Sequence, residues 1–181
     1  GHLFSNLIEN KTVVYPFLCL LVSGGHTQIW KVNDFGKYNL VSNTIDDAAG
    51  EAFDKGARIL GLGYPGGPEI EKSSVGGNEK FHFFPRPRVK TQKEAFSFSG
   101  LKTSLKYYVE NLSPDEIKTN LSNISSSYQE AIVDTLIDKL KYQINETTIK
   151  NITIAGGVAA NKRFRAKLNV MKNELDLNIK F

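Results

Sequence analysis

A Ser-Gly-Gly turn between two apolar segments is the feature of this sequence best suited to chemistry. The apolar run of residues 16–22 ends at residues 23–25, and an alternating pattern resumes over residues 27–32. Two strands joined in this way expose backbone N–H groups, and the glycines let a phosphate or acyl group approach where a Cβ would clash. The Ser23 hydroxyl adds a donor. Ser-Gly-Gly also occurs at hairpin tips for turn geometry alone, so the motif by itself leaves both interpretations open.

A second glycine-rich turn lies near the end of the sequence. Residues 151–155 predict a short strand, residues 156–157 a turn, and residue 158 onward a helix. A strand-to-helix turn directs helix N–H groups and the positive end of the helix dipole at a ligand. The spacing matches neither the dinucleotide fingerprint nor a P-loop. Asn161 lies one turn into the predicted helix, where its amide could bind a ribose or a base, or face solvent as an ordinary surface residue.

Basic residues lie beside aromatic residues at two places. Arg86, Arg88 and Lys90 follow the aromatic stretch 81–84, and residues 162–165 open the last predicted helix. Arginines beside exposed rings can bind a nucleic-acid backbone and stack on unpaired bases, and the net charge of +4 agrees with attraction to an anion. An ordinary solvated basic loop would have the same composition.

Composition limits the class of protein. The 181 residues are enough for about one domain with its own core, and 40% hydrophobic with 23% charged residues is typical of a soluble globular chain. The longest apolar run is too short to cross a bilayer. The single cysteine, Cys19, excludes an internal disulfide, is expected to be a buried strand residue, and favours a reducing compartment, so we expect a cytoplasmic protein.

The elements that must position these motifs follow an order of strands, then helices, then a strand–helix–strand unit, which predicts an α/β fold. Residues 16–23, 27–32 and 38–44 predict an antiparallel meander. Asp46 or Asp47 can cap the first helix, and Ser99 can cap the third. The predicted helices run from these aspartates to Leu60, from about Pro68, over residues 101–111 and, by an apolar stripe of period 3.6, over residues 121–144.

Five motifs, taken in order, closely resemble the TsaD family, formerly called glycoprotease or O-sialoglycoprotein endopeptidase. The family transfers a threonylcarbamoyl group from threonylcarbamoyl-AMP to N6 of adenosine 37 in transfer RNAs that read ANN codons. The second motif resembles its bacterial and organellar branch. The motifs are LVSGGHTQ (21–28), DDAAGEAFDK (46–55), YPGGP (64–68), FSFSGLKT (96–103) and AGGVAAN (155–161).

The resemblance implies an actin-like, Hsp70-like and sugar-kinase-like ATPase fold with ribonuclease H-like lobes, each a mixed sheet with flanking helices. This sequence would supply only part of that fold, so we expect the chain alone to be inactive and to self-associate through exposed apolar surface. The implied division is residues 1–15, the end of an interlobe helix and a linker; 16–45, the meander; 46–115, a helical insertion; and 116–181, a helix with the strand–helix–strand unit.

The resemblance also implies the site. A divalent metal, Fe²⁺ before Zn²⁺, would use His2, with the other ligands outside this sequence. Asp54 would accept ribose hydroxyls, although near Lys55 and Arg58 it could equally be an exposed helix charge. If transfer RNA is the substrate, the basic residues Arg86, Arg88 and Lys90 described above are the candidates to contact it. The substrate-binding residues implied by the motifs are Leu21, Val22, Ser23, Gly24, Gly25, Asp54, Gly67 and Asn161.

Further expectations concern partners and competing functions. The family implies a TsaB-like paralogue and a TsaE-like ATPase as partners, and no membrane. One alternative is a metallo-glycoprotease, which would need a zincin His-Glu-x-x-His motif that this sequence lacks. Another is a non-catalytic ATPase-fold partner subunit, although such partners usually lack the complete motif set found here.

Overall fold

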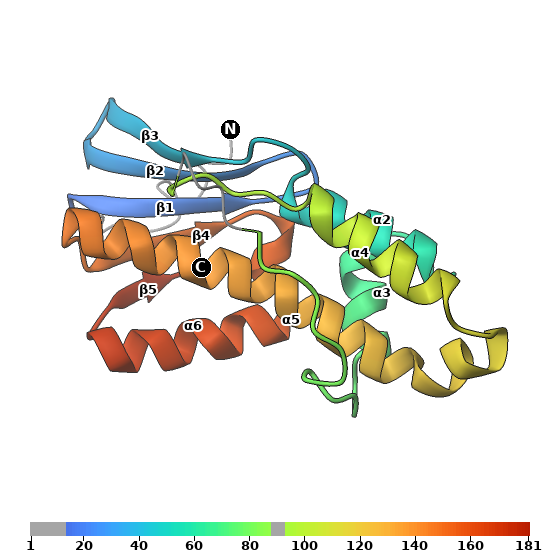
Figure 1. Ribbon diagram of the computed structural model, residues 1–181. Helices are drawn as coiled ribbons and strands as arrows, with labels where there is room; N and C mark the ends of the chain where they lie inside the picture. The colour runs from blue at the N-terminus through green and yellow to red at the C-terminus, as the bar shows by residue number, and fades with distance from the viewer. Residues whose placement is uncertain (1–13, 88–92) are drawn as a thin grey trace.

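A five-stranded mixed sheet carries both glycine turns. The computed structural model describes residues 14–87 and 93–181. The sheet has the order β3-β2-β1-β4-β5, in which β1, β2 and β3 are antiparallel and β1, β4 and β5 are parallel. The expected meander is therefore confirmed (Figure 1). The strands are β1 (Phe17–Val22), β2 (Thr27–Asp34), β3 (Lys37–Asn43), β4 (Asn151–Ala155) and β5 (Asn178–Lys180).

The central strand β1 is buried along its whole length, as its unbroken apolar sequence predicts. Its alternate side chains enter two apolar clusters, one including Leu18 and the other Cys19. Burial raises the pKa of the Cys19 thiol to about 12, so this residue is not a thiolate nucleophile at neutral pH. In the parallel pair of β1 with β4, Leu21 lies opposite Ala155, and both glycine turns therefore leave the sheet at the same edge.

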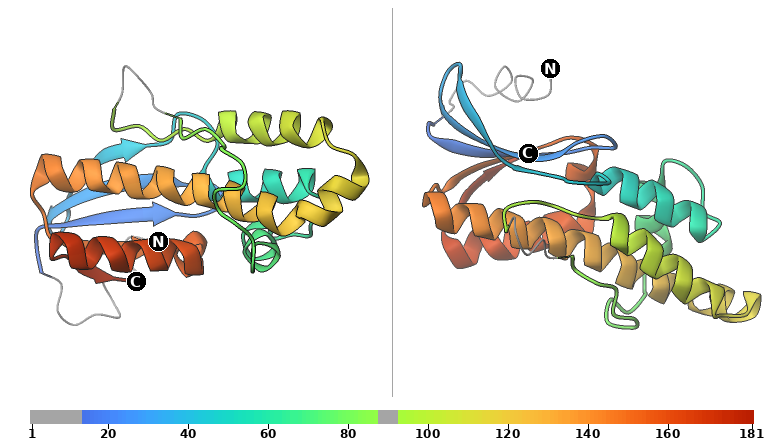
Figure 2. Two further views of the ribbon diagram at one scale, coloured as in Figure 1. Left: turned by 60° about the horizontal axis from the view of Figure 1, so that its bottom comes forward. Right: turned by 45° about the horizontal axis from the view of Figure 1, so that its top comes forward.

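One long helix connects the sheet to a helical layer. The C-terminal part of α5 lies beside α6 on one face of the sheet, and its N-terminal part packs among α2, α3 and α4 (Figures 1 and 2). Within the described ranges no helix, α5 included, is both long and apolar enough to cross a membrane. The helices are α2 (Ala49–Ile59), α3 (Gly66–Ser73), α4 (Ser99–Glu110), α5 (Pro114–Thr147), the 3₁₀ turn η1 (Gly157–Ala160) and α6 (Lys162–Leu175).

The predicted caps of α2 and α4 are wrong. Helix α2 begins after Ala48, which offers no side-chain cap, and its Ala49 N–H donates instead to the Thr27 hydroxyl of β2. Asp46 accepts hydrogen bonds from the backbone N–H groups of Phe98 (2.7 Å) and Ser99 (3.3 Å), so it caps the distant helix α4. Ser99 is itself the first residue of α4. These partners lie about fifty residues apart in the chain, where local cap rules do not apply.

Helix α5 is longer than its apolar stripe predicts. It begins with a capping box in which Ser113 and Glu116 bond reciprocally, with Pro114 in the first turn. Most residues of the first two turns are exposed, and Ile117 is the only aliphatic residue among residues 114–120, which is too few to show a helical period. The buried stripe itself is confirmed, and Tyr128 at its centre is fully buried.

Candidate functional site

A cleft of about 920 Å³ lies where the two glycine turns meet α2, α3, α5 and the start of α6. Gly24, Asp54, Gly67 and Asn161, which come from four separate motifs, all line it. Leu21, Val22, Ser23 and Gly25 are not among its lining residues, and their predicted contacts with substrate stay predictions. Further lining residues are Phe53, Tyr64, Glu71, Ser74, Gln129, Glu130, Gly157, Val158, Lys162 and Arg163.

The glycines around the cleft fall into two groups. A Cβ built on Gly24, Gly67 or Gly157 would meet no atom within 4 Å, so these positions leave backbone open toward the cleft. A Cβ on Gly50 would lie 2.6 Å from the Ser23 carbonyl oxygen, and one on Gly66 would lie 2.5 Å from the Asp54 Cα. The first group leaves space for a ligand, and the second lets α2 pack against the Ser-Gly-Gly turn and α3 pack against α2.

The Ser-Gly-Gly turn is held by its own hydrogen bonds. The Ser23 N–H donates to the His26 carbonyl (2.8 Å), and the His26 N–H donates to the Ser23 hydroxyl oxygen (3.1 Å). The Gly50 N–H of α2 donates to the Ser23 carbonyl (3.2 Å). The side chains of Leu21 and Val22 are buried in the sheet. In this structure these residues fix the position of the turn, and Gly24 is the one that faces the cleft.

Asp54 is anchored by the helix that follows it. Its Oδ1 accepts a hydrogen bond of 2.7 Å from the Gly66 N–H at the start of α3. The neighbouring Lys55 pairs with Asp47 (2.6 Å) and Glu51 (2.8 Å). Asp54 is half-buried in the cleft wall, so the structure does not support its interpretation as an exposed helix charge.

Asn161 is the N-cap of α6, not a residue one turn inside it. The intervening residues form the 3₁₀ turn η1, which delays the start of the helix. Its Oδ1 accepts from the Phe164 N–H (2.9 Å), and its Nδ2 donates to Gln129 Oε1 (2.8 Å). Asn161 is only 7% exposed, so it is not the ordinary surface residue that the sequence left open.

Glu71 is a cleft residue that the sequence analysis missed. It lies on α3, and its Oε2 accepts a hydrogen bond of 2.9 Å from the Lys162 N–H at the first turn of α6. This bond connects α3 to α6 beside the cleft. Glu71 follows Gly67 by four residues, a spacing that places both on the same face of a helix, and this spacing was the available signal.

An ion-pair cluster borders the cleft. Glu130 Oε2 accepts from Arg163 Nε (2.6 Å), and Glu130 Oε1 accepts from Arg163 Nη2 (2.8 Å) and pairs with Lys167 (2.5 Å). Lys167 also pairs with Asp134. Burial raises the pKa of Glu130, but the hydrogen bonds from Arg163 and Lys167 outweigh it and hold this pKa below its ordinary range. The cluster joins α5 to α6.

Replacing Glu130 tests the contribution of this cluster to stability. A carboxyl whose pKa is lowered by folding stabilises the protein above its unfolded pKa, about 4.3, and that contribution disappears as pH falls through the folded pKa. Glu130→Gln should therefore lower the free energy of unfolding at pH 7 and reduce its further loss on acidification below about pH 4.5. Urea unfolding across a pH series measures both effects. Parallel stability profiles for the variant and the wild type would contradict the assignment.

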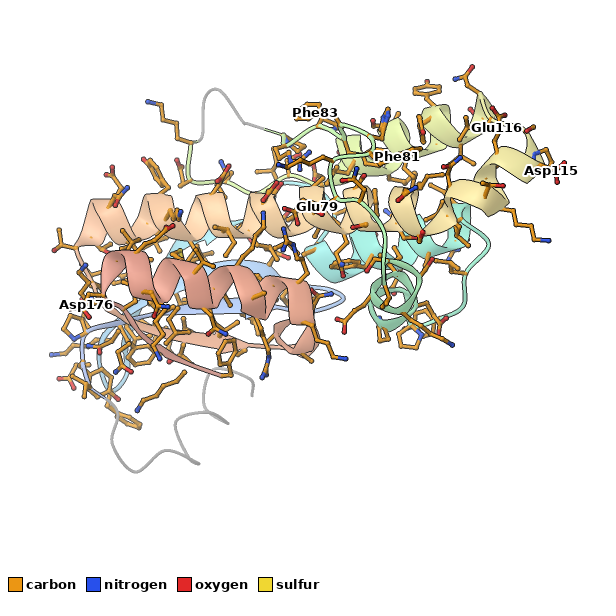
Figure 3. The ribbon with its side chains drawn as sticks, turned by 90° about the horizontal axis from the view of Figure 1, so that it is seen from below. Glu79, Phe81, Phe83, Asp115, Glu116 and Asp176 are labelled. Atoms are coloured by element: carbon orange, nitrogen blue, oxygen red, sulfur yellow. The ribbon has the colours of Figure 1, made fainter. Side chains whose placement is uncertain are left out.

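The expected transfer-RNA segment is only partly described, because Arg88 and Lys90 lie outside the described residues. Phe83 is 78% exposed, and the guanidinium carbon of Arg86 lies 5.1 Å from its ring centroid. Arg86 also donates to Asp134 Oδ2 through Nη2 (2.7 Å) and Nε (3.0 Å). Figure 3 shows Glu79, Phe81 and Phe83 along the loop that crosses α5. Arg86 therefore anchors this segment to α5, and its contact with transfer RNA stays a prediction.

The anchoring role of Arg86 has its own test. Arg86→Ala removes both bonds to Asp134 and the bond to the Phe84 carbonyl, so it should lower the free energy of unfolding by about 1–3 kcal/mol. Lys106→Ala is the matched control, because its pair with Glu110 is exposed at 3.6 Å and should contribute at most about 0.5 kcal/mol. Chemical unfolding measures the loss of stability in both variants. Equal losses in Arg86→Ala and Lys106→Ala would contradict the anchoring role.

The described residues do not test the expected metal site, whose other ligands would lie outside this sequence. Across residues 14–87 and 93–181, no three His, Cys, Asp or Glu side chains are grouped closely enough to hold a metal ion. The expected ligand His2 lies outside the described residues. The iron or zinc centre therefore stays a prediction.

Comparison with solved structures shows the fold. A crystal structure of T. kodakarensis HypF gives a TM-score of 0.66 at 14% identity, over 90% of this chain and 31% of that one. The activator of 2-hydroxyisocaproyl-CoA dehydratase from Clostridium difficile, solved with bound ADPNP, gives 0.52 at 14% identity, over 92% of this chain and 54% of that one. The chain thus has the mixed sheet and flanking helices of the actin-like ATPase fold, as expected.

Comparison with relatives shows the family. A relative from Thermodesulfovibrio yellowstonii named tRNA N6-adenosine threonylcarbamoyltransferase is 47% identical over 96% of this chain and 53% of its own length. One of the same name from Kosmotoga olearia is 45% identical over 100% of this chain and 53% of its own length. The chain therefore spans about half the length of these relatives. The sequence model of TsaD, described as tRNA N6-adenosine threonylcarbamoyltransferase, matches residues 1–181, and the chain belongs to the TsaD family.

Proposed function

We propose that the complete protein transfers a threonylcarbamoyl group from threonylcarbamoyl-AMP to N6 of adenosine 37 in transfer RNAs that read ANN codons. The cleft described above would hold the adenylate. The observation that carries the proposal is the convergence of Gly24, Asp54, Gly67 and Asn161, from four separate motifs, on one cleft large enough for a nucleotide.

The lining residues suit the parts of an adenylate. The carboxylates of Asp54 and Glu71 can accept hydrogen bonds from ribose hydroxyls, and the Asn161 amide can bind the base. The N–H groups of Lys162 and Phe164 at the start of α6 already have partners, so the phosphate would be bound by the open glycine backbone. The sequence predicted that the glycine turns and the helix N-terminus would bind the anion together, and this arrangement gives the larger part to the glycine backbone.

The chemistry needs orientation more than activation of the substrate. Threonylcarbamoyl-AMP is a mixed anhydride, so the N6 amine of adenosine can attack its carbamoyl carbon directly. The new C–N bond forms, the C–O bond to phosphate breaks, AMP carries the electron pair away, and N6 loses a proton. The residues of this chain would hold the adenylate for that attack and stabilise the departing phosphate.

The proposal is tested with the complete protein that contains this chain. It should bind threonylcarbamoyl-AMP and form the modified adenosine on unmodified transfer RNA, and Asn161→Ala should weaken adenylate binding. If the complete protein bound neither the adenylate nor AMP, the proposed function would be wrong. The present chain alone should form no product. A TsaB-like paralogue and a TsaE-like ATPase as partners, and a metal bound partly by His2, belong to the same proposal and can be checked by co-purification and metal analysis.

A further inference from the structure

Gln129 lies at the centre of a hydrogen-bond chain that joins two walls of the cleft. It projects from α5 and is only 5% exposed. Its Oε1 accepts from Asn161 Nδ2 (2.8 Å) at the start of α6, and its Nε2 donates to the Ser74 hydroxyl oxygen (3.0 Å) at the end of α3. One buried side chain therefore holds α3, which carries Gly67, and the start of α6, which carries Asn161, in their relative positions.

The groups at the two ends of this series of hydrogen bonds fix the direction of every bond in it. At one end the Phe164 backbone N–H, which can only donate, bonds to Asn161 Oδ1 (2.9 Å). At the other end the Glu71 carbonyl, which can only accept, receives the Ser74 hydroxyl proton (2.8 Å). The Asn161 nitrogen must then donate to Gln129, and the Gln129 nitrogen must donate to Ser74. Neither amide can be reversed without placing two donors or two acceptors in contact.

We propose that Gln129 is a positioning residue of the adenylate site, an inference that rests on the proposed function. It would act through Asn161, because it orients the amide that meets the ligand. After its bond to Gln129, the Asn161 nitrogen keeps a second N–H, which matches an acceptor such as a ring nitrogen of adenine. The role requires no contact between Gln129 and the reacting atoms.

The test uses the complete protein, with AMP as the probe and calorimetry as the measurement. Gln129→Met keeps the length of the side chain and removes both hydrogen bonds, so it should weaken AMP binding about three- to tenfold. If Gln129 acts through Asn161, adding Gln129→Met to Asn161→Ala should change AMP affinity by less than about twofold. A merely structural role would not produce this non-additivity.

Two further variants guard against a general loss of folding. Ser74→Ala removes the half-buried hydroxyl that accepts a hydrogen bond from Gln129. It should also weaken AMP binding, by about twofold to fivefold. Ser125→Ala is the matched control, because Ser125 donates to Ser73 (3.0 Å) between the same two helices, and neither residue lines the cleft. It should bind AMP as the wild type does. Circular dichroism establishes that each variant is folded.

The outcomes separate the two proposals. Wild-type AMP affinity in folded Gln129→Met and Ser74→Ala overturns the positioning role, even if Asn161→Ala loses binding and the proposed function stands. Strictly additive losses in Gln129→Met and Asn161→Ala overturn it as well. A wild-type protein that binds neither AMP nor the adenylate overturns the proposed function and this inference together.

Discussion

Gly156→Ala should abolish folding or lower the free energy of unfolding by roughly 3–5 kcal/mol. Gly156 has φ 99° and ψ 168°, a backbone conformation that is accessible essentially only to glycine. A Cβ at this position would lie 2.2 Å from the carbonyl oxygen of Val22 in β1, which cannot move without disturbing the sheet. The substitution therefore combines backbone strain with a clash at the point where β4 turns beside the Ser-Gly-Gly segment.

The neighbouring glycine supplies the control for this prediction. A Cβ on Gly157 would meet no atom within 4 Å, so Gly157→Ala should change the free energy of unfolding by less than about 1 kcal/mol. Thermal and urea unfolding of the two variants, compared with the wild type, measure the difference. Equal midpoints for Gly156→Ala and Gly157→Ala would show that close packing on Val22 does not constrain this turn.

Asp54→Ala should weaken adenylate binding about tenfold to a hundredfold, or roughly 1.5–3 kcal/mol, because the ribose hydroxyls lose a charged acceptor. It also leaves the Gly66 N–H at the start of α3 without its partner. Asp54→Asn separates the two effects, because the amide oxygen can still accept from Gly66 while the charge is gone. Asp54→Asn should therefore have nearly the wild-type free energy of unfolding but a clearly lower affinity for the adenylate.

Glu51→Ala is the matched control on the same helix. Glu51 pairs with Lys55 at 2.8 Å on an exposed part of α2 and does not line the cleft. Calorimetry of adenylate binding and urea unfolding on all three variants complete the comparison. Asp54→Ala with wild-type affinity would show that the carboxylate serves only to hold α3, and would remove it from the substrate site.

The sequence by itself determined the family and the main elements. An apolar run such as β1 is typical of a strand buried on both faces, and the apolar stripe of α5 is typical of a helix that packs on a core. Residues 124–133 of α5 are in fact buried on every face, which the stripe alone does not predict. Glycine pairs after two strands marked both turns correctly, because turns of this kind depend on residues only one or two positions apart. Five motifs in order sufficed to identify the resemblance that the comparisons confirmed.

The tertiary structure decided which groups meet. Asp46 lies next to its own helix in sequence but caps α4, because a carboxylate bonds to whichever N–H groups the fold brings near it. Arg86 reads as a free basic residue in the sequence, yet it is paired with Asp134 on a helix 48 residues away. Sequence patterns over a few neighbouring residues cannot predict partners that lie about 50 positions away.

The same distinction applies within the cleft. The motifs predicted Asp54 and Asn161 as ligand residues, whereas Gln129 gave no signal because it is one polar residue in a helix whose apolar pattern predicts only core packing. Its importance depends on Ser74 and Asn161, which are 55 and 32 residues away along the chain. Covalent neighbours determine which turns and helices form, but the direction of a buried amide is determined by the donors and acceptors that packing places around it.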